Sequence, residues 1–292
     1  MHNELTFERY LAQRKHSAKT IRSYSYAVKN FLALRPDAAK FSYRDVINFM
    51  SEKVAQTENK SAIAVELAAI KRYYDFLLET GVRQDHPCRS LNFKGTSRNR
   101  NVVHVDLFSS EELEKLLERE ERYAALKLKN QALVSLLIYQ GLIAQEIANM
   151  KTHHVDLDAG LIYVKESRMS SRRHLPILPR QYRILERYLR ESRGELISVE
   201  TDALLVGKLG TPITVDDIHY IISTYKPLFP DRNITPMIIR QSVIANWLNE
   251  ASLALEQVQI MAGHRWISTT LKYRQSNHEQ HRELINRWHP LG

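Results

Sequence analysis

Apolar residues recur at helical spacing along most of this chain, and the pattern gives way to β-rich runs around one polar turn. Segments such as SAIAVELAAIKRYYDFLLETG and KNQALVSLLIYQG favour helices packed against an apolar core. The runs GLIYVKES and RRHLPIL flank the turn RMSS, and they predict a β-hairpin. The chain is therefore expected to be mainly α-helical, with a small β-sheet in its second half.

The order of these segments predicts two domains. Residues 1–92 contain four amphipathic helices, with Ser17 a predicted N-cap and Gly81 a predicted C′ glycine. Residues 93–104 have little apolar periodicity and are interpreted as a linker. The second domain, 105–292, is expected to open with a capping box formed by Ser109 and Glu112.

Positive charge is concentrated in the first domain. The formal net charge of the chain is +9, and residues 1–100 carry 18 Lys and Arg against 10 Asp and Glu. An excess of this kind favours a polyanionic partner, nucleic acid first, although an ordinary basic surface is the alternative. Lys71 and Arg72 lie off the apolar stripe of the fourth helix and are candidates for phosphate contacts.

Several other functions are disfavoured by what the sequence lacks. Cys88 is the single cysteine and cannot form an internal disulfide, which indicates a reducing compartment. The N-terminal residues have no signal-peptide pattern, and no apolar run is long enough to span a membrane. GKLGTP lacks the spacing of a phosphate-binding loop, and no cluster of Cys and His has metal-site spacing. We expect a cytoplasmic protein with neither cofactor nor metal.

Three polar residues in the last third of the chain are candidates for chemistry. Arg240 lies in the apolar segment TPMIIRQSVIANWL, where a buried guanidinium needs an anion or a distant acidic partner. His264 and Tyr273 lie in AGHRWISTTLKY, nine residues apart. Taken singly, His264 is interpreted as a helix-cap residue and Tyr273 as a core or surface aromatic.

Together, these stretches resemble the tyrosine recombinase (phage integrase, Xer-like) family. TPMIIRQSVIANWL is similar to the helix that carries its His-x-x-Arg signature, and IMAGHRWISTTLKY to its Gly-His…Tyr box. The resemblance implies an N-terminal four-helix (SAM-like) core-binding domain and an α+β integrase-type catalytic domain. It also implies a site-specific recombinase that cleaves and rejoins DNA through a 3′-phosphotyrosine, without ATP.

The same resemblance assigns roles to individual residues. Tyr273 is the implied nucleophile, Arg240 clamps the phosphate and His264 helps to move protons. The family's hairpin lysine, the general acid, corresponds either to Lys165 or, by counting back from LPIL, to Arg168. Arginine donates protons poorly because it stays charged.

The active-site pattern is nevertheless degenerate. Ile143 stands where the family has its first arginine, Met237 replaces the histidine of His-x-x-Arg, and Gln241 replaces a second histidine. Loss of one preorganised donor typically costs a factor of about 10²–10³ in rate. The substitutes available near the hairpin turn are Arg168, Arg172 and Arg173. Two interpretations stay open: a rebuilt active site, or a catalytically degenerate protein that binds DNA or regulates an active partner.

The expected partner is double-stranded DNA held between the two domains. Members of this family act as tetramers that exchange a C-terminal helix, and residues 280–289, with Leu284, Ile285 and Trp288, are the candidate segment here. The alternative is that this tail packs on its own domain. A homo-tetramer on DNA, with or without a second recombinase, and association with the nucleoid are therefore expected.

Overall fold

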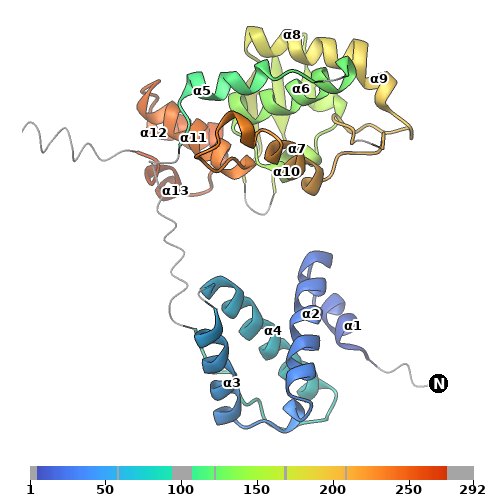
Figure 1. Ribbon diagram of the computed structural model, residues 1–292, viewed down its shortest axis with the longest axis vertical. Coiled ribbons are helices and arrows are strands. Elements are labelled where there is room, and N and C mark those ends of the chain that lie inside the picture. Colours follow the sequence, from blue (N-terminus) through green and yellow to red (C-terminus); the bar gives the residue numbers. More distant parts are fainter. Residues whose placement is uncertain are drawn as a thin grey trace, which may run out of the picture. The chain divides into compact units, whose positions relative to one another are not determined.

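The computed structural model describes residues 5–57, 59–93, 107–121, 123–167, 170–207 and 209–274. The chain divides into two compact units, Met1–Arg100 and Asn101–Gly292 (Figure 1). Each unit has its own hydrophobic core and is described by itself. The predicted linker, 93–104, lies almost wholly outside the described residues, so the predicted domain boundaries stay predictions.

The described part of the first unit is helical. Its α-helices are α1 (Phe7–Gln13), α2 (Ala18–Leu34), α3 (Tyr43–Gln56) and α4 (Lys60–Glu79). The Ser17 side chain caps α2, and Gly81 follows α4 with φ +72°, as the sequence predicted. At the start of α3, Ser42 and Asp45 form a capping box. Local capping chemistry thus fixes where these helices begin and end.

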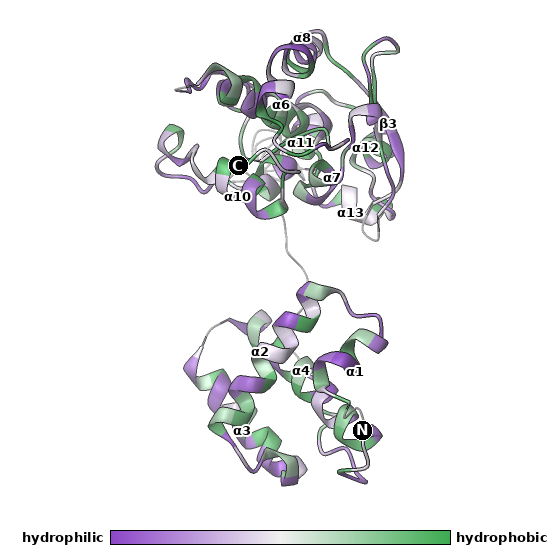
Figure 2. Cartoon of the chain, turned by 90° about the vertical axis from the view of Figure 1, so that its right-hand side faces the viewer, coloured by the Kyte–Doolittle hydropathy of each residue, from purple (hydrophilic) through white to green (hydrophobic). Residues whose placement is uncertain are grey.

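Aromatic side chains form much of this unit's core. The rings of Phe31 and Phe49 lie 4.8 Å apart, and the Tyr74 hydroxyl donates to the carbonyl of Ala38 at 2.8 Å. Figure 2 shows hydrophobic and hydrophilic residues along the helices of this unit, and the buried residues of α4 recur about every three or four positions. Cys88 is fully buried against this core, and burial raises the pKa of its thiol to about 12.

The second unit combines helices with a small sheet. Its helices are α5 (Ser110–Glu114), α6 (Ala124–Gln140), α7 (Ala144–Ala148), α8 (Pro179–Arg187), α9 (Arg193–Leu196), α10 (Val215–Ser223), α11 (Pro236–Asn249), α12 (Leu255–Ala262) and α13 (Ile267–Leu271). Its strands are β1 (Val155–Asp156), β2 (Leu161–Val164) and β3 (Arg173–Pro176), antiparallel in the order β1-β2-β3. The predicted hairpin is confirmed as β2–β3, whereas β1 was not predicted. The capping box of Ser109 and Glu112 is confirmed at the start of α5.

Helices α6 and α11 form the centre of this unit. Both are buried on most sides, and they pack against each other. Gly141 ends α6 with φ +56°, and a Cβ there would lie 3.3 Å from Val243 and 3.4 Å from Trp247 on α11. A glycine is therefore needed both for the left-handed backbone and for the close approach of the two helices.

Two absences apply to the described part of the chain. None of its helices is both long and apolar enough to cross a membrane. No group of three or more His, Cys, Asp or Glu side chains within these same residues is arranged to hold a metal ion.

Candidate active site

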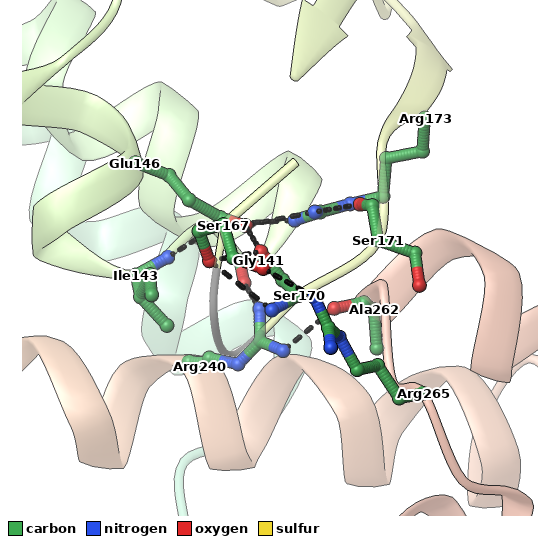
Figure 3. Close-up of polar contacts among 10 residues, drawn as sticks. All are labelled: Gly141, Ile143, Glu146, Ser167, Ser170, Ser171, Arg173, Arg240, Ala262 and Arg265. Carbon is green, nitrogen blue, oxygen red and sulfur yellow. Dashed lines mark hydrogen bonds and ion pairs between the residues drawn. The ribbon is translucent and has the colours of Figure 1, made fainter. Parts of the chain in front are cut away.

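Arg240 is the buried centre of a polar cluster inside the second unit. It projects from α11, 6% exposed, and its guanidinium donates to the carbonyls of Gly141 and, at 2.6 Å, Ala262 (Figure 3). Burial lowers its pKa, Glu146 opposes that change and Arg173 adds to it. The fold therefore holds Arg240 at the junction of α6, α7 and α12, where its guanidinium donates to backbone carbonyls.

Glu146 and Arg173 form an ion pair beside Arg240. Two guanidinium nitrogens of Arg173 donate to the two carboxylate oxygens of Glu146 at 2.8 and 3.0 Å, and both side chains are no more than 2% exposed. Ser170 Oγ and the backbone N–H of Ile143 complete the donors to the carboxylate, at 2.7 and 3.0 Å. Burial alone would raise the pKa of Glu146, but Arg173 and the other donors hold it below its usual value.

The space for Arg173 depends on Gly263. This glycine follows α12 with φ +69°, and a Cβ on it would lie 2.5 Å from Nη1 of Arg173. The Ser171 N–H donates to the Gly263 carbonyl at 3.0 Å, and Arg265 donates to the Ser167 carbonyl at 2.7 Å. These contacts fasten the β2–β3 hairpin to the connection between α12 and α13 (Figure 3).

Tyr273 follows α13 and packs into a small apolar cluster. Its neighbours in that cluster include Ile244 on α11 and Val258 on α12, and the tyrosine is 8% exposed. Burial raises the pKa of its hydroxyl, while Arg240 and the Gln241 side chain act to lower it. The phenol is thus protonated at neutral pH and lies within the electrostatic reach of the buried arginine.

His264 connects Tyr273 to the rest of the cluster. Its ring stacks on that of Tyr273, and its Nδ1 lies 2.9 Å from Oγ1 of Thr270. Burial, with the positive charges of Arg240 and Arg173, lowers the pKa of His264 to about 4. The imidazole is therefore neutral at physiological pH, with Thr270 fixing its orientation.

The remaining residues predicted for the catalytic domain are placed less centrally. Lys165 follows β2, exposed, in the lining of a small cavity that also contains Ile143 and Glu146. Arg172 is exposed beside β3, and Met237 on α11 is 49% exposed. Arg168 lies outside the described residues, as does the predicted exchange segment 280–289.

The two phosphate-contact candidates of the first unit have local partners. The Lys71 ammonium donates to the carbonyl of Arg89 at 3.1 Å, and Arg72 pairs with Asp75 at 3.0 Å. Both side chains are half-buried. Their predicted role in DNA binding stays a prediction.

Sequence reasoning did not foresee two partnerships in this site. It treated Arg173 as one of several basic residues near a turn, and it gave Thr270 no role. A signal for Arg173 was present in the sequence. Arg173, Leu175 and Ile177 occupy every second position of the run RRHLPIL, so they are expected on the same face of a strand. A cation in line with apolar residues that face the core indicates a buried ion pair. No comparable sequence pattern indicated a role for Thr270, because its contact with the His264 ring depends on the path that the chain takes between the two residues.

Two family models match this chain. The model described as "Phage integrase family" matches residues 106–280, more than half of the chain, and the one described as "Phage integrase, N-terminal SAM-like domain" matches residues 6–81. The chain belongs to the phage integrase family, the family of tyrosine recombinases. The resemblance found in the sequence is thereby confirmed, as is the predicted fold class.

Individual relatives match along nearly their whole length. The tyrosine recombinase XerC of Anoxybacillus flavithermus is 24% identical, with 95% of this chain and 94% of the relative covered. The tyrosine recombinase XerD of Oceanobacillus iheyensis is 27% identical over the same shares of the two chains.

Solved structures share the fold at lower identity. The XerH site-specific recombinase bound to a palindromic difH substrate aligns with a TM-score of 0.72 at 17% identity, covering 94% of this chain and 81% of that one. A lambda integrase dimer bound to a core site aligns with a TM-score of 0.66 at 14% identity, covering 93% and 94%.

Proposed function

We propose that this chain is a site-specific DNA recombinase in which Tyr273 is the nucleophile. The observation that carries the proposal is the placement of Tyr273 against a neutral, oriented His264 and within the electrostatic reach of the buried Arg240. These residues come from separate elements of the fold, yet Tyr273 stacks on His264 and the charge of Arg240 acts on both. That convergence supports a reaction site over three unrelated core positions.

In the proposed reaction, the Tyr273 oxygen attacks the scissile phosphorus and forms a 3′-phosphotyrosine. The bond from phosphorus to the 5′-oxygen breaks, so one phosphoester replaces another and no external energy source is needed. The Tyr273 proton leaves to His264, whose Nδ1 is engaged by Thr270. Arg240 stabilises the charge that develops on the non-bridging oxygens.

Lys165 is proposed to protonate the departing 5′-oxygen. Its exposed position at the end of β2 lets the flexible side chain reach a phosphate bound near Ile143 and Glu146. Lysine also titrates more readily than arginine, which suits it to donate a proton.

Double-stranded DNA is the proposed partner. Relatives and similar structures are recombinases, and the XerH and lambda integrase structures hold their own DNA sites. The excess of 18 basic over 10 acidic residues in 1–100 supports the same partner for this chain. Assembly as a homo-tetramer through the C-terminal tail is part of the proposal.

A second function is favoured by the departures at Ile143 and Met237. An isoleucine supplies no cation, and a methionine that is 49% exposed supplies no acidic proton donor. The alternative is a recombinase-family protein that binds DNA or an active partner without cutting. The two functions differ in one product, the covalent adduct.

The adduct test begins with duplexes that the protein enriches from a randomised library. A panel of these duplexes, nicked at successive positions, traps cleaved strands on the enzyme, and the adduct is detected after denaturation in SDS. We expect an adduct with the wild type and none with Tyr273→Phe, which keeps the ring, its packing and its DNA affinity. Binding by both proteins with no adduct at any nick position would establish the non-cutting alternative instead.

A further inference from the structure

Glu146 is a buried carboxylate near Ile143, where the resemblance to the family implies an arginine. Ile143, at the junction of α6 and α7, offers this carboxylate only a backbone N–H. A buried carboxylate without a cation is costly, and the usual result is protonation. Here the cation arrives from another element, because Arg173 on β3 pairs with both carboxylate oxygens.

The register of the hairpin explains why Arg173 is the residue that reaches this place. Val164 pairs with Arg173 across β2 and β3, and along both strands buried residues alternate with more exposed ones. Arg173 therefore points inward with Leu175, while its neighbour Arg172 is exposed. The absence of a Cβ at Gly263 leaves room for its guanidinium.

The geometry leaves the Nε donor of Arg173 uncommitted. Glu146 holds two of its terminal N–H groups, whereas Nε is buried and has no hydrogen-bond partner among the described residues. A buried donor without a partner is costly, so an acceptor that reached Nε when a phosphate is bound would relieve that cost. With Glu146 negative, Arg173 and Arg240 positive and His264 neutral, the cluster keeps one net positive charge for one phosphodiester.

We propose that Arg173 supplies the second guanidinium of the phosphate site, doing from β3 what a first arginine at position 143 would do from the α6–α7 junction. Glu146 orients this guanidinium through its terminal nitrogens, and Nε donates to a non-bridging oxygen of the scissile phosphate. The inference rests on the proposed function, because it assigns a ligand of the phosphate that Tyr273 attacks.

The test compares cleavage with binding in a charge-matched double variant. Arg173→Gln alone would leave Glu146 buried and unpaired, so it can unfold the protein for that reason. Glu146→Gln/Arg173→Gln removes both charges and leaves two amides that can hydrogen-bond to each other, and Gln has nearly the size of Glu. The matched control is Arg187→Gln/Glu191→Gln, which removes an exposed ion pair of the same unit, and thermal unfolding establishes that the wild type, the double variant and this control are folded.

We expect the double variant to form the Tyr273 adduct about 10²–10³-fold more slowly, the cost typical of a lost preorganised donor, with DNA affinity within a few fold of the wild type. The control should cleave like the wild type. Equal cleavage rates in the double variant and the wild type would overturn the role of Arg173 while leaving the recombinase intact. No adduct from the wild type would overturn the proposed function itself.

A methylphosphonate at the scissile position separates a phosphate ligand from a structural residue. The methyl group removes the negative charge that a guanidinium would neutralise, so the loss of Arg173 should matter less. On this substrate, the double variant should form the adduct less than about tenfold more slowly than the wild type. If the double variant were slowed by the same factor on the phosphate and the methylphosphonate substrates, Arg173 would only support the fold of the site.

Discussion

The ring of His264 stacks on the ring of Tyr273, with centroids 5.9 Å apart and planes inclined by 18°. The contact joins His264, which follows the left-handed Gly263 at the end of α12, to Tyr273, the second residue after the end of α13. Thr270, the fourth residue of α13, holds the other side of the imidazole through Nδ1. The stacking and the Thr270 contact therefore fix the orientation of the His264 ring beside Tyr273.

The first prediction concerns pH and stability. The folded pKa of His264, about 4, lies below the ordinary value of 6.5, so the unfolded chain binds the proton first as the pH falls. The free energy of unfolding should decrease between about pH 6.5 and pH 4, by on the order of 3 kcal/mol from this residue. Urea unfolding of the wild type and of His264→Gln measures the effect, and the variant should lose that share of the pH dependence. Identical pH dependence in the two proteins would contradict the shift.

The second prediction concerns the orientation of His264. Thr270→Val keeps the shape of the side chain and removes the hydroxyl that contacts Nδ1. Adduct formation should slow by about tenfold, which corresponds to a hydrogen bond of roughly 1.4 kcal/mol, with DNA affinity unchanged. Thr269→Val is the matched control in the same helix. Equal rates for both variants would show that the Thr270 contact does not orient the ring for reaction.

The third prediction tests the space that Arg173 occupies. Gly263 and Gly160 both have left-handed backbones, with φ +69° and +65°, but a Cβ on Gly160 would have nothing within 4 Å. Gly160→Ala should therefore cost only the conformational strain, about 1–2 kcal/mol. Gly263→Ala should cost about 1–3 kcal/mol more, because the new methyl group meets Arg173. Chemical unfolding gives both values, and equal costs would mean that Arg173 moves aside freely.

The fourth prediction concerns the first unit. If Lys71 and Arg72 contact DNA phosphates, Lys71→Gln and Arg72→Gln should each weaken binding and reduce the slope of log affinity against log salt by about 0.9. Lys53→Gln, which removes an equal charge from a lysine paired with Glu66 on α4, is the control. Gel shifts over a salt series give the slopes. A similar loss in all three variants would indicate a general charge effect.

Much of the fold is readable from the sequence because the signals are local. The cap of α2 at Ser17, the capping box at Ser109 and the glycine at 81 each act within a few residues, and the hairpin follows from alternation along two short runs. Strand β1 was missed because two residues, Val155 and Asp156, are too few to form a pattern. Its pairing depends on β2, not on its own sequence.

The site was only partly readable, for a different reason. Spacing identified Arg240, His264 and Tyr273 as candidates, and the structure gathers them into one cluster. The pairing of Arg173 with Glu146 joins residues 27 positions apart, and nothing near either residue specifies the other. Alternation along the run RRHLPIL distinguishes the inward-facing Arg173 from Arg172, but it does not identify Glu146 as the partner.

The buried thiol of Cys88 makes this chain a convenient object for spectroscopy. With a pKa near 12 and no exposed surface, the native cysteine will not compete for maleimide dyes at neutral pH. A cysteine introduced at the exposed Tyr26 in one unit and another at the exposed Tyr220 in the other would take a donor–acceptor pair without removal of the native residue. Energy transfer between those dyes would report whether the distance between the two units changes when a duplex is added.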